Sequence, residues 1–321
     1  KVQQLTVTDH ELIVKTQLSK ETLICKSDDA VNELKVKQEN DMQSAVLDLN
    51  AFHADHGVIM AKGGKALSSN DLRLSRYAFT ADQLIRVYSD DAGYMNLAGE
   101  PHRSVLTRLY WAEEQIGMEV ETRLSNADKL KTAYFELKGE SSSLTMPPVT
   151  GKIYVQGSSV TAAAIIPICD DAFTKNMVAD KWKTYIIYEF EDGSVQKHTI
   201  AADAVAQLSR KPYKDYYYSV YPNMDLDMIV KVTRKWKWYE SNKLRRKFVE
   251  LFIYPMLRML PVRKKRIVFE GWWGQKFHCN PKAFYKYMDK EHPDYTCIWS
   301  LVDERTPIEG NGIRVRRQSL R

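Results

Sequence analysis

Residues 266–321 constrain the fold most, because they have the pattern of a parallel βαβ unit. The apolar run at 267–270 predicts a buried strand that leads into a Gly-Trp-Trp-Gly loop. A helix is expected after that loop, and residues 295–302 and 313–316 predict two further strands. Strand, helix and strand in this order predict a parallel sheet, since the handedness of such crossovers is nearly fixed. The sheet is expected to be incomplete within this chain and to leave one edge uncovered.

The loop and the start of the expected helix form a candidate phosphate-binding site. Asn280 is a favourable N-cap, and Pro281 suits the first helical turn. Ligands of open α/β sheets bind beyond the carboxyl ends of strands, where a helix N-terminus attracts anions. The candidate contacts for a substrate or its phosphate are Gly271, Trp272, Trp273, Gly274 and Asn280. A structural role, in which Trp273 fills a domain interface, is an equally open interpretation. The apolar face of the helix is expected to comprise Ala283, Phe284, Tyr287 and Met288.

This stretch resembles the entrance to the CDP-glycerol and CDP-ribitol phosphotransferases, the wall teichoic acid primases and polymerases. The resemblance rests on an ordered set of residues and not on one diagnostic position. It covers roughly the last sixth of the chain. The matching residues are Ile267, Val268, Phe269, Glu270, Gly274, Asn280, Pro281, Lys282, Ala283, Trp299, Ser319 and Leu320.

The resemblance implies a GT-B fold, in which two Rossmann-like halves hold a CDP-alditol donor, and only the first βαβ unit of one half is expected here. It implies that the chain is the N-terminal portion of an enzyme that extends a lipid-linked polyol-phosphate polymer. The family's catalytic histidines lie in a Trp-His-Gly-Thr-Pro type segment and further along, and residues 1–321 contain neither segment. No catalytic residue is therefore assigned, His278 included, and the chain alone is expected to be inactive. No cofactor is expected beyond the family's donor, CDP-glycerol or CDP-ribitol.

Residues 1–240 predict two all-β domains, at 1–108 and 109–240. Apolar and polar residues alternate in short runs, as at 12–14 and 186–190, and glycine-containing turns occur at 62–65, 91–93 and 191–193. Short strands with regular turns favour immunoglobulin-like β-sandwiches. Residues 9–19 and 114–125 resemble each other, and each segment precedes a Glu-Leu-Lys triplet. The second domain is therefore a possible repeat of the first.

These β-domains contain no pattern that predicts catalysis or a metal site. His53 and His56 flank Asp55 without a further ligand cluster, so no metal is expected. The four cysteines are scattered without a C-x-x-C pair, which predicts free, mostly buried thiols in a reducing compartment. The tyrosine-rich segment 213–221 favours a strand, and stacking on sugars or bases is the alternative.

Positive charge is concentrated at the C-terminal end. Residues 231–321 contain 22 Lys and Arg against 9 Asp and Glu, although the whole chain has a net charge of only +6. Such an asymmetry predicts a basic surface with an anionic partner. No nucleic-acid reading element is recognisable, so nucleic acid is disfavoured against an anionic membrane or a phosphate-rich substrate.

Residues 241–265 predict a basic amphipathic helix between the β-domains and the α/β unit. Pro255 is expected to kink this helix and Pro261 to end it. An apolar arc opposite a cationic face is typical of a helix that lies on a membrane surface, and a linker helix packed on a neighbouring domain is the alternative. The candidate membrane-binding residues are Lys243, Arg245, Arg246, Lys247, Phe248, Phe252, Arg258, Arg263, Lys264, Lys265 and Arg266.

No apolar run approaches the length of a transmembrane helix, and the mean hydropathy is −0.44. Together with the resemblance, this predicts a peripheral protein on the cytoplasmic face of the bacterial plasma membrane. Its expected partners are the anionic membrane and a lipid-linked teichoic acid acceptor, and a homo-oligomer remains open. The alternative function is a non-catalytic, membrane-associated β-domain scaffold or polymer-binding module.

Overall fold

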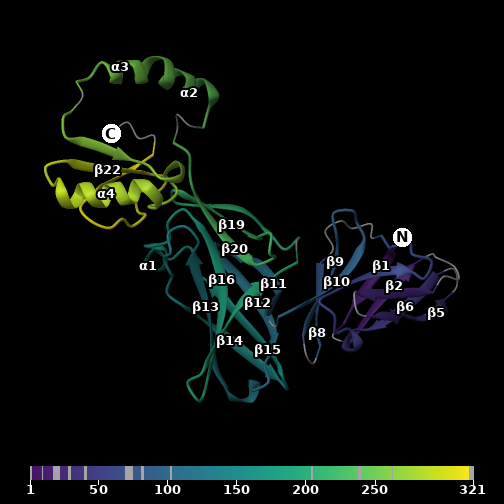
Figure 1. Ribbon diagram of the computed structural model, residues 1–321. Coiled ribbons are helices and arrows are strands. Elements are labelled where there is room, and N and C mark those ends of the chain that lie inside the picture. Colours follow the sequence, from purple (N-terminus) through teal and green to yellow (C-terminus); the bar gives the residue numbers. More distant parts are fainter. Residues whose placement is uncertain are drawn as a thin grey trace.

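The computed structural model describes residues 2–8, 10–16, 22–27, 30–39, 42–68, 75–80, 83–101, 103–203, 205–237, 241–261 and 263–317. Over these residues the chain is mostly β-sheet with few helices. Figure 1 shows three successive bodies: an N-terminal pair of sheets, a central strand-rich body and a C-terminal α/β unit. Each body has its own cluster of buried apolar side chains.

The N-terminal body consists of two antiparallel sheets around one core. The four-stranded sheet has the order β1 (Val2–Val7), β2 (Glu11–Thr16), β6 (Met42–Asp48) and β5 (Lys35–Glu39). The six-stranded sheet has the order β4 (Val31–Glu33), β3 (Leu23–Ser27), β7 (His56–Ala61), β10 (Met95–Glu100), β9 (Leu84–Ser89) and β8 (Ser75–Phe79). A short turn of helix, η1 (Leu49–Ala51), follows β6. Leu12 and Val14 are fully buried between the sheets, as their alternation predicts.

The central body contains a closed ring of seven strands. Their order is β13 (Leu130–Gly139), β14 (Val149–Gln156), β15 (Ser159–Ile166), β12 (Gln115–Arg123), β11 (Ser104–Ala112), β17 (Val195–Ala201) and β16 (Lys181–Phe190), and β16 pairs again with β13. Three strands branch from β16, namely β20 (Met228–Arg234), β19 (Tyr216–Pro222) and β18 (Leu208–Tyr213). The turns η2 (Ala127–Lys129) and α1 (Asp171–Thr174) lie between strands.

This ring differs from the second sandwich that the sequence predicts. The alternating run at 186–190 lies in β16, and the turn at 191–193 follows it as predicted. The closure depends on the β13–β16 pairing and on a short parallel contact between β11 and β17, both between strands distant in sequence. The N-terminal body has a different strand order, so the structure gives the proposed repeat no support. The predicted division between residues 108 and 109 falls inside β11.

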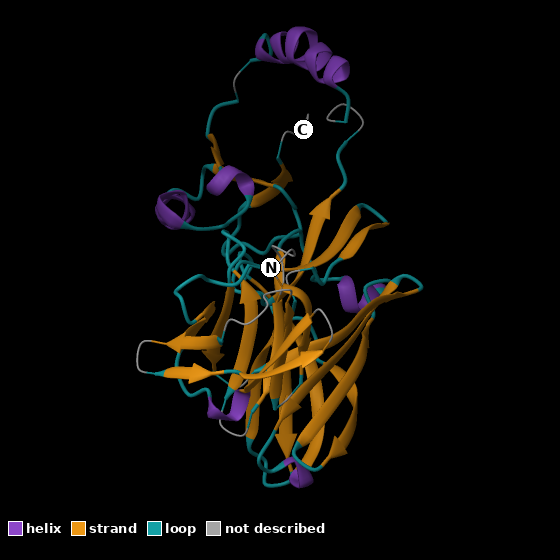
Figure 2. Ribbon diagram, turned by 90° about the vertical axis from the view of Figure 1, so that its right-hand side faces the viewer, coloured by secondary structure: helices purple, strands orange, loops and turns teal. Residues whose placement is uncertain are grey.

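The segment after the central body is a single helical rod. It comprises α2 (Lys243–Phe248), a π-helical turn η3 (Val249–Ile253) and α3 (Tyr254–Arg258). Asn242 caps its start, because its side chain accepts a hydrogen bond from the backbone N–H of Leu244. Pro255 has no N–H for the carbonyl of Leu251, and the π-helical turn directly before it accommodates this loss. In Figures 1 and 2 the rod lies clear of the sheets.

The C-terminal body is the predicted βαβ unit. Strands β21 (Arg266–Phe269), β22 (Thr296–Leu301) and β23 (Ile313–Arg316) form one parallel sheet in sequence order. Between the first two strands lie the turn η4 (Trp272–Gly274) and helix α4 (Cys279–Glu291). Trp299 is fully buried under α4, where it packs against Phe269, Phe277 and Tyr285.

Candidate functional site

The Gly-Trp-Trp-Gly loop is a tight left-handed turn at the carboxyl end of β21. Trp272, Trp273 and Gly274 all have positive φ, at 47°, 58° and 77°. The turn is fixed to the neighbouring strand, because the carbonyl of Gly274 accepts a hydrogen bond of 2.8 Å from the backbone N–H of Val302. Two consecutive tryptophans in this conformation are unusual, since a side chain at positive φ is strained. Both side chains point to solvent, with 62% and 72% of their surface exposed.

The loop lies against the start of α4. Trp272 Nε1 is 3.3 Å from Cys279 Sγ, and His278 Nδ1 is 2.9 Å from the same sulfur. The prediction of Asn280 as the N-cap is wrong, because α4 begins at Cys279 and His278 holds the cap position without a side-chain hydrogen bond. Cys279 itself has φ of 61°, so the chain turns one residue earlier than expected. Pro281 still falls in the first turn, where its missing N–H costs nothing.

Helix α4 buries only part of the face that the sequence predicts, namely Met288. Tyr285 and Met288 are buried, whereas Phe284 and Tyr287 are more than half exposed. The Tyr285 hydroxyl donates to the carbonyl of Glu309 and accepts from the N–H of Gly312, both at 2.8 Å. These bonds tie the helix to the turn before β23.

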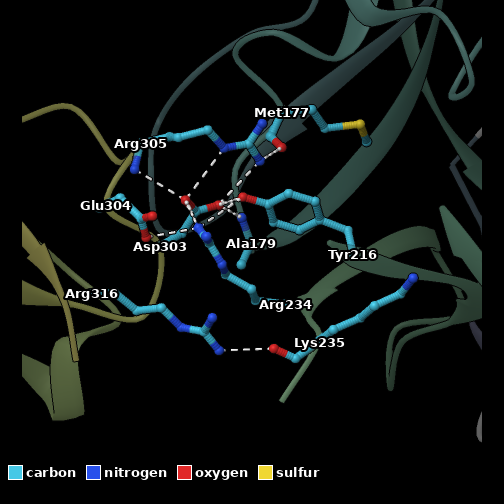
Figure 3. A network of polar contacts seen from close by, with 9 residues as sticks. All are labelled: Met177, Ala179, Tyr216, Arg234, Lys235, Asp303, Glu304, Arg305 and Arg316. Atoms are coloured by element: carbon cyan, nitrogen blue, oxygen red, sulfur yellow. Dashed lines mark hydrogen bonds and ion pairs between the residues drawn. The ribbon is translucent and has the colours of Figure 1, made fainter. Parts of the chain in front are cut away.

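A buried carboxylate, Asp303, joins the α/β unit to the central body (Figure 3). It accepts hydrogen bonds from the Ala179 N–H and the Tyr216 hydroxyl, each at 2.9 Å, and from the backbone and side chain of its neighbour Arg305. Arg234 of β20 lies 3.3 Å from Asp303 and 2.7 Å from Glu304.

Two further contacts complete this junction. The Arg305 guanidinium donates to the Met177 carbonyl at 2.7 Å, and that of Arg316 donates to the Lys235 carbonyl at 2.8 Å. Ionic and hydrogen-bonded contacts therefore hold the α/β unit on the end of β19 and β20.

The junction shifts the pKa values of its members. Burial alone would raise the pKa of Asp303, but the hydrogen bonds and charge of Arg305 hold it below its ordinary value. Burial, and then the Asp303 carboxylate, raise the pKa of the Tyr216 phenol. Asp303 is thus a stable anion at neutral pH, and Tyr216 remains a protonated donor.

An open groove of about 590 Å³ lies beside this junction. Its lining includes the cations Lys175, Lys214, Arg234 and Arg305. Most of these charges are already matched, since Lys214 pairs with Asp171 and both arginines contact carboxylates. The groove is therefore close to electrically neutral.

The helical rod exposes the apolar face that the sequence predicts. None of residues 243–258 is buried, so the structure does not place this face on a neighbouring domain. Phe248 and Phe252 stack with ring centroids 5.2 Å apart and are 51% and 63% exposed. Among the candidate cations, Lys265 is engaged with Asp294 at 2.6 Å. In the described part of the chain, no helix is long and apolar enough to span a bilayer.

Sequence comparisons find relatives of the C-terminal segment. The pattern of the family described as CDP-Glycerol:Poly(glycerophosphate) glycerophosphotransferase matches residues 252–321. The teichoic acid poly(glycerol phosphate) polymerase of Bacillus subtilis (strain 168) is 35% identical over 71 residues, or 22% of this chain and 10% of that protein. The polymerase of the same description from Staphylococcus epidermidis (strain ATCC 35984) is 36% identical over 78 residues, or 24% of this chain and 11% of that protein. The C-terminal segment of the chain, residues 252–321, is therefore similar to this family.

The match to these glycerophosphotransferases covers about a tenth of the polymerases' length, and residues 1–251 lie outside the family pattern. Among solved structures, a pullulanase from Anoxybacillus sp. LM18-11 overlaps 64% of this chain and 26% of its own. Its identity of 8% and TM-score of 0.18 support no assignment.

The matched segment, residues 252–321, contains the candidate loop and the start of α4, and it contains the rod only from Phe252 onward. Glu270, one of the residues that resemble the family, accepts from Ser300 Oγ at 2.6 Å and from Arg317 Nε at 3.2 Å, which ties β21 to the neighbouring strand. Ser319 and Leu320 lie outside the described residues.

Sequence reasoning missed Asp303, because one acidic residue in a polar loop carries no signal of burial. The described residues contain no group of three His, Cys, Asp or Glu side chains placed to hold a metal. All four cysteines are free, and Cys25 and Cys297 are buried.

Proposed function

We propose that the chain is the N-terminal portion of a teichoic acid poly(glycerol phosphate) polymerase that takes glycerol phosphate from CDP-glycerol and adds it to a lipid-linked polymer. The match of residues 252–321 to the glycerophosphotransferase family carries this proposal. CDP-glycerol is favoured over CDP-ribitol because both polymerases above are described as poly(glycerol phosphate) polymerases.

In this proposal the βαβ unit is the beginning of a GT-B domain. The left-handed loop and the start of α4 form one wall of the donor cleft, at the carboxyl end of β21 where α/β folds bind ligands. Gly271 and Gly274 are buried and let the loop pack closely on Lys276 and on β22, and the N-terminus of α4 adds positive potential for a phosphate. The residues that carry out the transfer belong to segments outside residues 1–321.

We further propose that the enzyme works as a peripheral protein on the inner face of the membrane. The exposed apolar face of the rod and the cations around it support this location. Apolar side chains are expected to enter the headgroup boundary, while Lys243, Arg246 and Lys247 meet anionic lipid headgroups.

A donor-specific assay tests the proposed reaction. The polypeptide encoded by the natural reading frame that contains residues 1–321 is incubated with a lipid-linked glycerol phosphate acceptor and either CDP-glycerol or CDP-ribitol. We expect CMP release and polymer growth with CDP-glycerol. Turnover with CDP-ribitol alone would overturn the choice of donor, and turnover with neither would overturn the reaction.

A second function, a non-catalytic polymer-binding module, is supported by the size of the β-rich region outside the family pattern. It differs from the first in one measurable way. A module of this kind binds polymer without releasing CMP when the same natural polypeptide is assayed.

A further inference from the structure

The outward surface of the branched strands carries cations that the proposed reaction does not use. Residues alternate along β16, where Trp182 and Thr184 are buried and Lys181 and Lys183 point outward. On β20, Val230 and Val232 are buried and Lys231 lies on the same outward surface. We call this surface the lysine–tyrosine face. It comprises Lys138, Lys181, Lys183, Arg210, Tyr217 and Lys231.

Two pairs of lysines oppose each other directly on this face. Lys181 is the cross-strand partner of Lys231 in the β16–β20 pair, and Lys138 is the partner of Lys183 in the β13–β16 pair. Cross-strand neighbours lie about 5 Å apart, and like charges in such positions destabilise a sheet. This arrangement is costly unless an anion offsets it.

The protein itself offsets only one of these four charges. Lys183 pairs with Asp227 at 2.5 Å. Within the described ranges, no carboxylate lies at ion-pair distance from Lys138, Lys181 or Lys231. Asp180, next to Lys181, is occupied by backbone N–H groups, including those of Ser141 and Ser142. Three lysines therefore remain available to an external anion.

Aromatic rings alternate with the cations. Tyr217 lies between the Arg210 guanidinium, 3.7 Å from its ring centroid, and the Lys235 ammonium, at 5.6 Å. Tyr185 lies in the same way between Lys183, at 5.9 Å, and Lys197, at 4.2 Å. Cations bind phosphate oxygens, while a tyrosine ring offers an apolar surface to short carbon segments.

We propose that the lysine–tyrosine face binds a polymer in which phosphodiesters alternate with short polyol segments, so that it holds the growing product. This inference rests on the proposed function, which supplies such a polymer. Lys181 and Lys231 can bind one phosphate together and Lys138 can bind the next, and because strands lie about 5 Å apart these lysines form a track across the sheet. The track begins beside the α/β unit, because Tyr216 of β19 and Arg234 of β20 both contact Asp303 of that unit.

A lipid-free binding assay tests the proposal. The 321-residue chain is titrated into a fluorescent glycerol phosphate oligomer at low salt, without donor or membrane. The double variant Lys181→Gln/Lys231→Gln is expected to bind about tenfold more weakly than the wild type, with a weaker dependence on salt. The matched control Lys26→Gln/Lys152→Gln removes the same charge from exposed positions on β3 and β14 and is expected to bind as the wild type does. Thermal unfolding checks that both variants are folded.

Several outcomes would overturn the proposal. Equal losses in the two double variants would mean that only net charge matters. Equal affinity for single-stranded DNA of the same charge would mean a general polyanion surface. In a separate titration with anionic vesicles, a loss for Lys181→Gln/Lys231→Gln that does not occur with the oligomer would make the face a membrane contact. Because the assay contains neither donor nor lipid, the proposed reaction can fail while this binding stands, and the reverse holds as well.

Discussion

Asp303 shows how one side chain fixes the relation between two bodies of the molecule. It lies between Arg234 and Arg305, and its side chain has no exposed surface. Removal of the carboxylate leaves the Arg305 guanidinium without the carboxylate that it contacts and Arg234 with Glu304 alone, which costs roughly 3 kcal/mol. We therefore expect Asp303→Ala to lower the free energy of unfolding by about 3 kcal/mol in urea titrations. Asp294→Ala, which removes an exposed partner of Lys265, is the control and should change the midpoint little. Equal effects would contradict the role of Asp303.

The same carboxylate predicts a pH dependence. Its pKa in the folded protein lies below the ordinary value of 3.8, since Arg305 outweighs the effect of burial. A group with a lowered folded pKa stabilises the protein above its unfolded pKa, and this stability is lost as the pH falls through the folded pKa. The stability difference between wild type and Asp303→Asn should be constant from neutral pH to about pH 5 and shrink below about pH 4. A difference that persists unchanged in acid would refute this assignment.

A comparison of alanine substitutions at Gly274 and Gly193 distinguishes the cost of backbone strain from the cost of a steric clash. Both have positive φ, at 77° and 79°, so alanine at either position carries a conformational cost of roughly 1 to 2 kcal/mol. A Cβ at Gly274 would also lie 3.1 Å from the Ser300 carbonyl oxygen, whereas nothing lies within 4 Å at Gly193. Gly274→Ala should therefore lose about 1 kcal/mol more than Gly193→Ala in chemical unfolding. Equal losses would show that the loop can move away from β22.

At the scale of elements, α4 shows what the sequence could and could not predict. Helical periodicity and Pro281 predict the helix, and its type and place are confirmed. Met288 is buried as predicted, but Tyr285 is buried in place of Phe284, because neighbouring aromatic residues lie only about 100° apart on a helix and tertiary partners decide which one is covered. Tyr285 is the residue that is buried because it packs against Gly312 and Trp299, which are close to it in space and distant in sequence. Closure of the central ring also depends on residues distant in sequence, because β13 pairs with β16. By contrast, the three strands of the α/β unit can be predicted from the local sequence pattern alone.

The helical rod gives a prediction at the scale of an element. Phe248→Glu/Phe252→Glu places two charges where apolar side chains would enter the membrane, so affinity for anionic vesicles should fall at least about tenfold. Cosedimentation with vesicles at low salt measures this effect. The control Tyr154→Glu/Met224→Glu changes two side chains of the central body that are more open to solvent, with 65% and 102% exposure. Wild-type binding should also weaken at 0.5 M salt, because the Debye length is then well below 8 Å. Undiminished binding of the phenylalanine variant would exclude the rod as the membrane contact.

For the whole molecule, we expect that residues 1–321 can bind ligands but cannot catalyse the transfer of glycerol phosphate. Phosphoryl transfer needs a group that moves a proton at the attacking hydroxyl and donors that stabilise the leaving CMP. The α/β unit contains two histidines, and neither is placed for this task. His278 contacts the thiol of Cys279, and His292 packs between Tyr287 and Tyr295 at the far end of α4. The 321-residue chain, given CDP-glycerol and a lipid-linked acceptor, should therefore release no CMP above the level of a heat-inactivated sample. Measurable release would place catalytic groups within residues 1–321, and His278→Ala would then show whether the loop beside α4 supplies them.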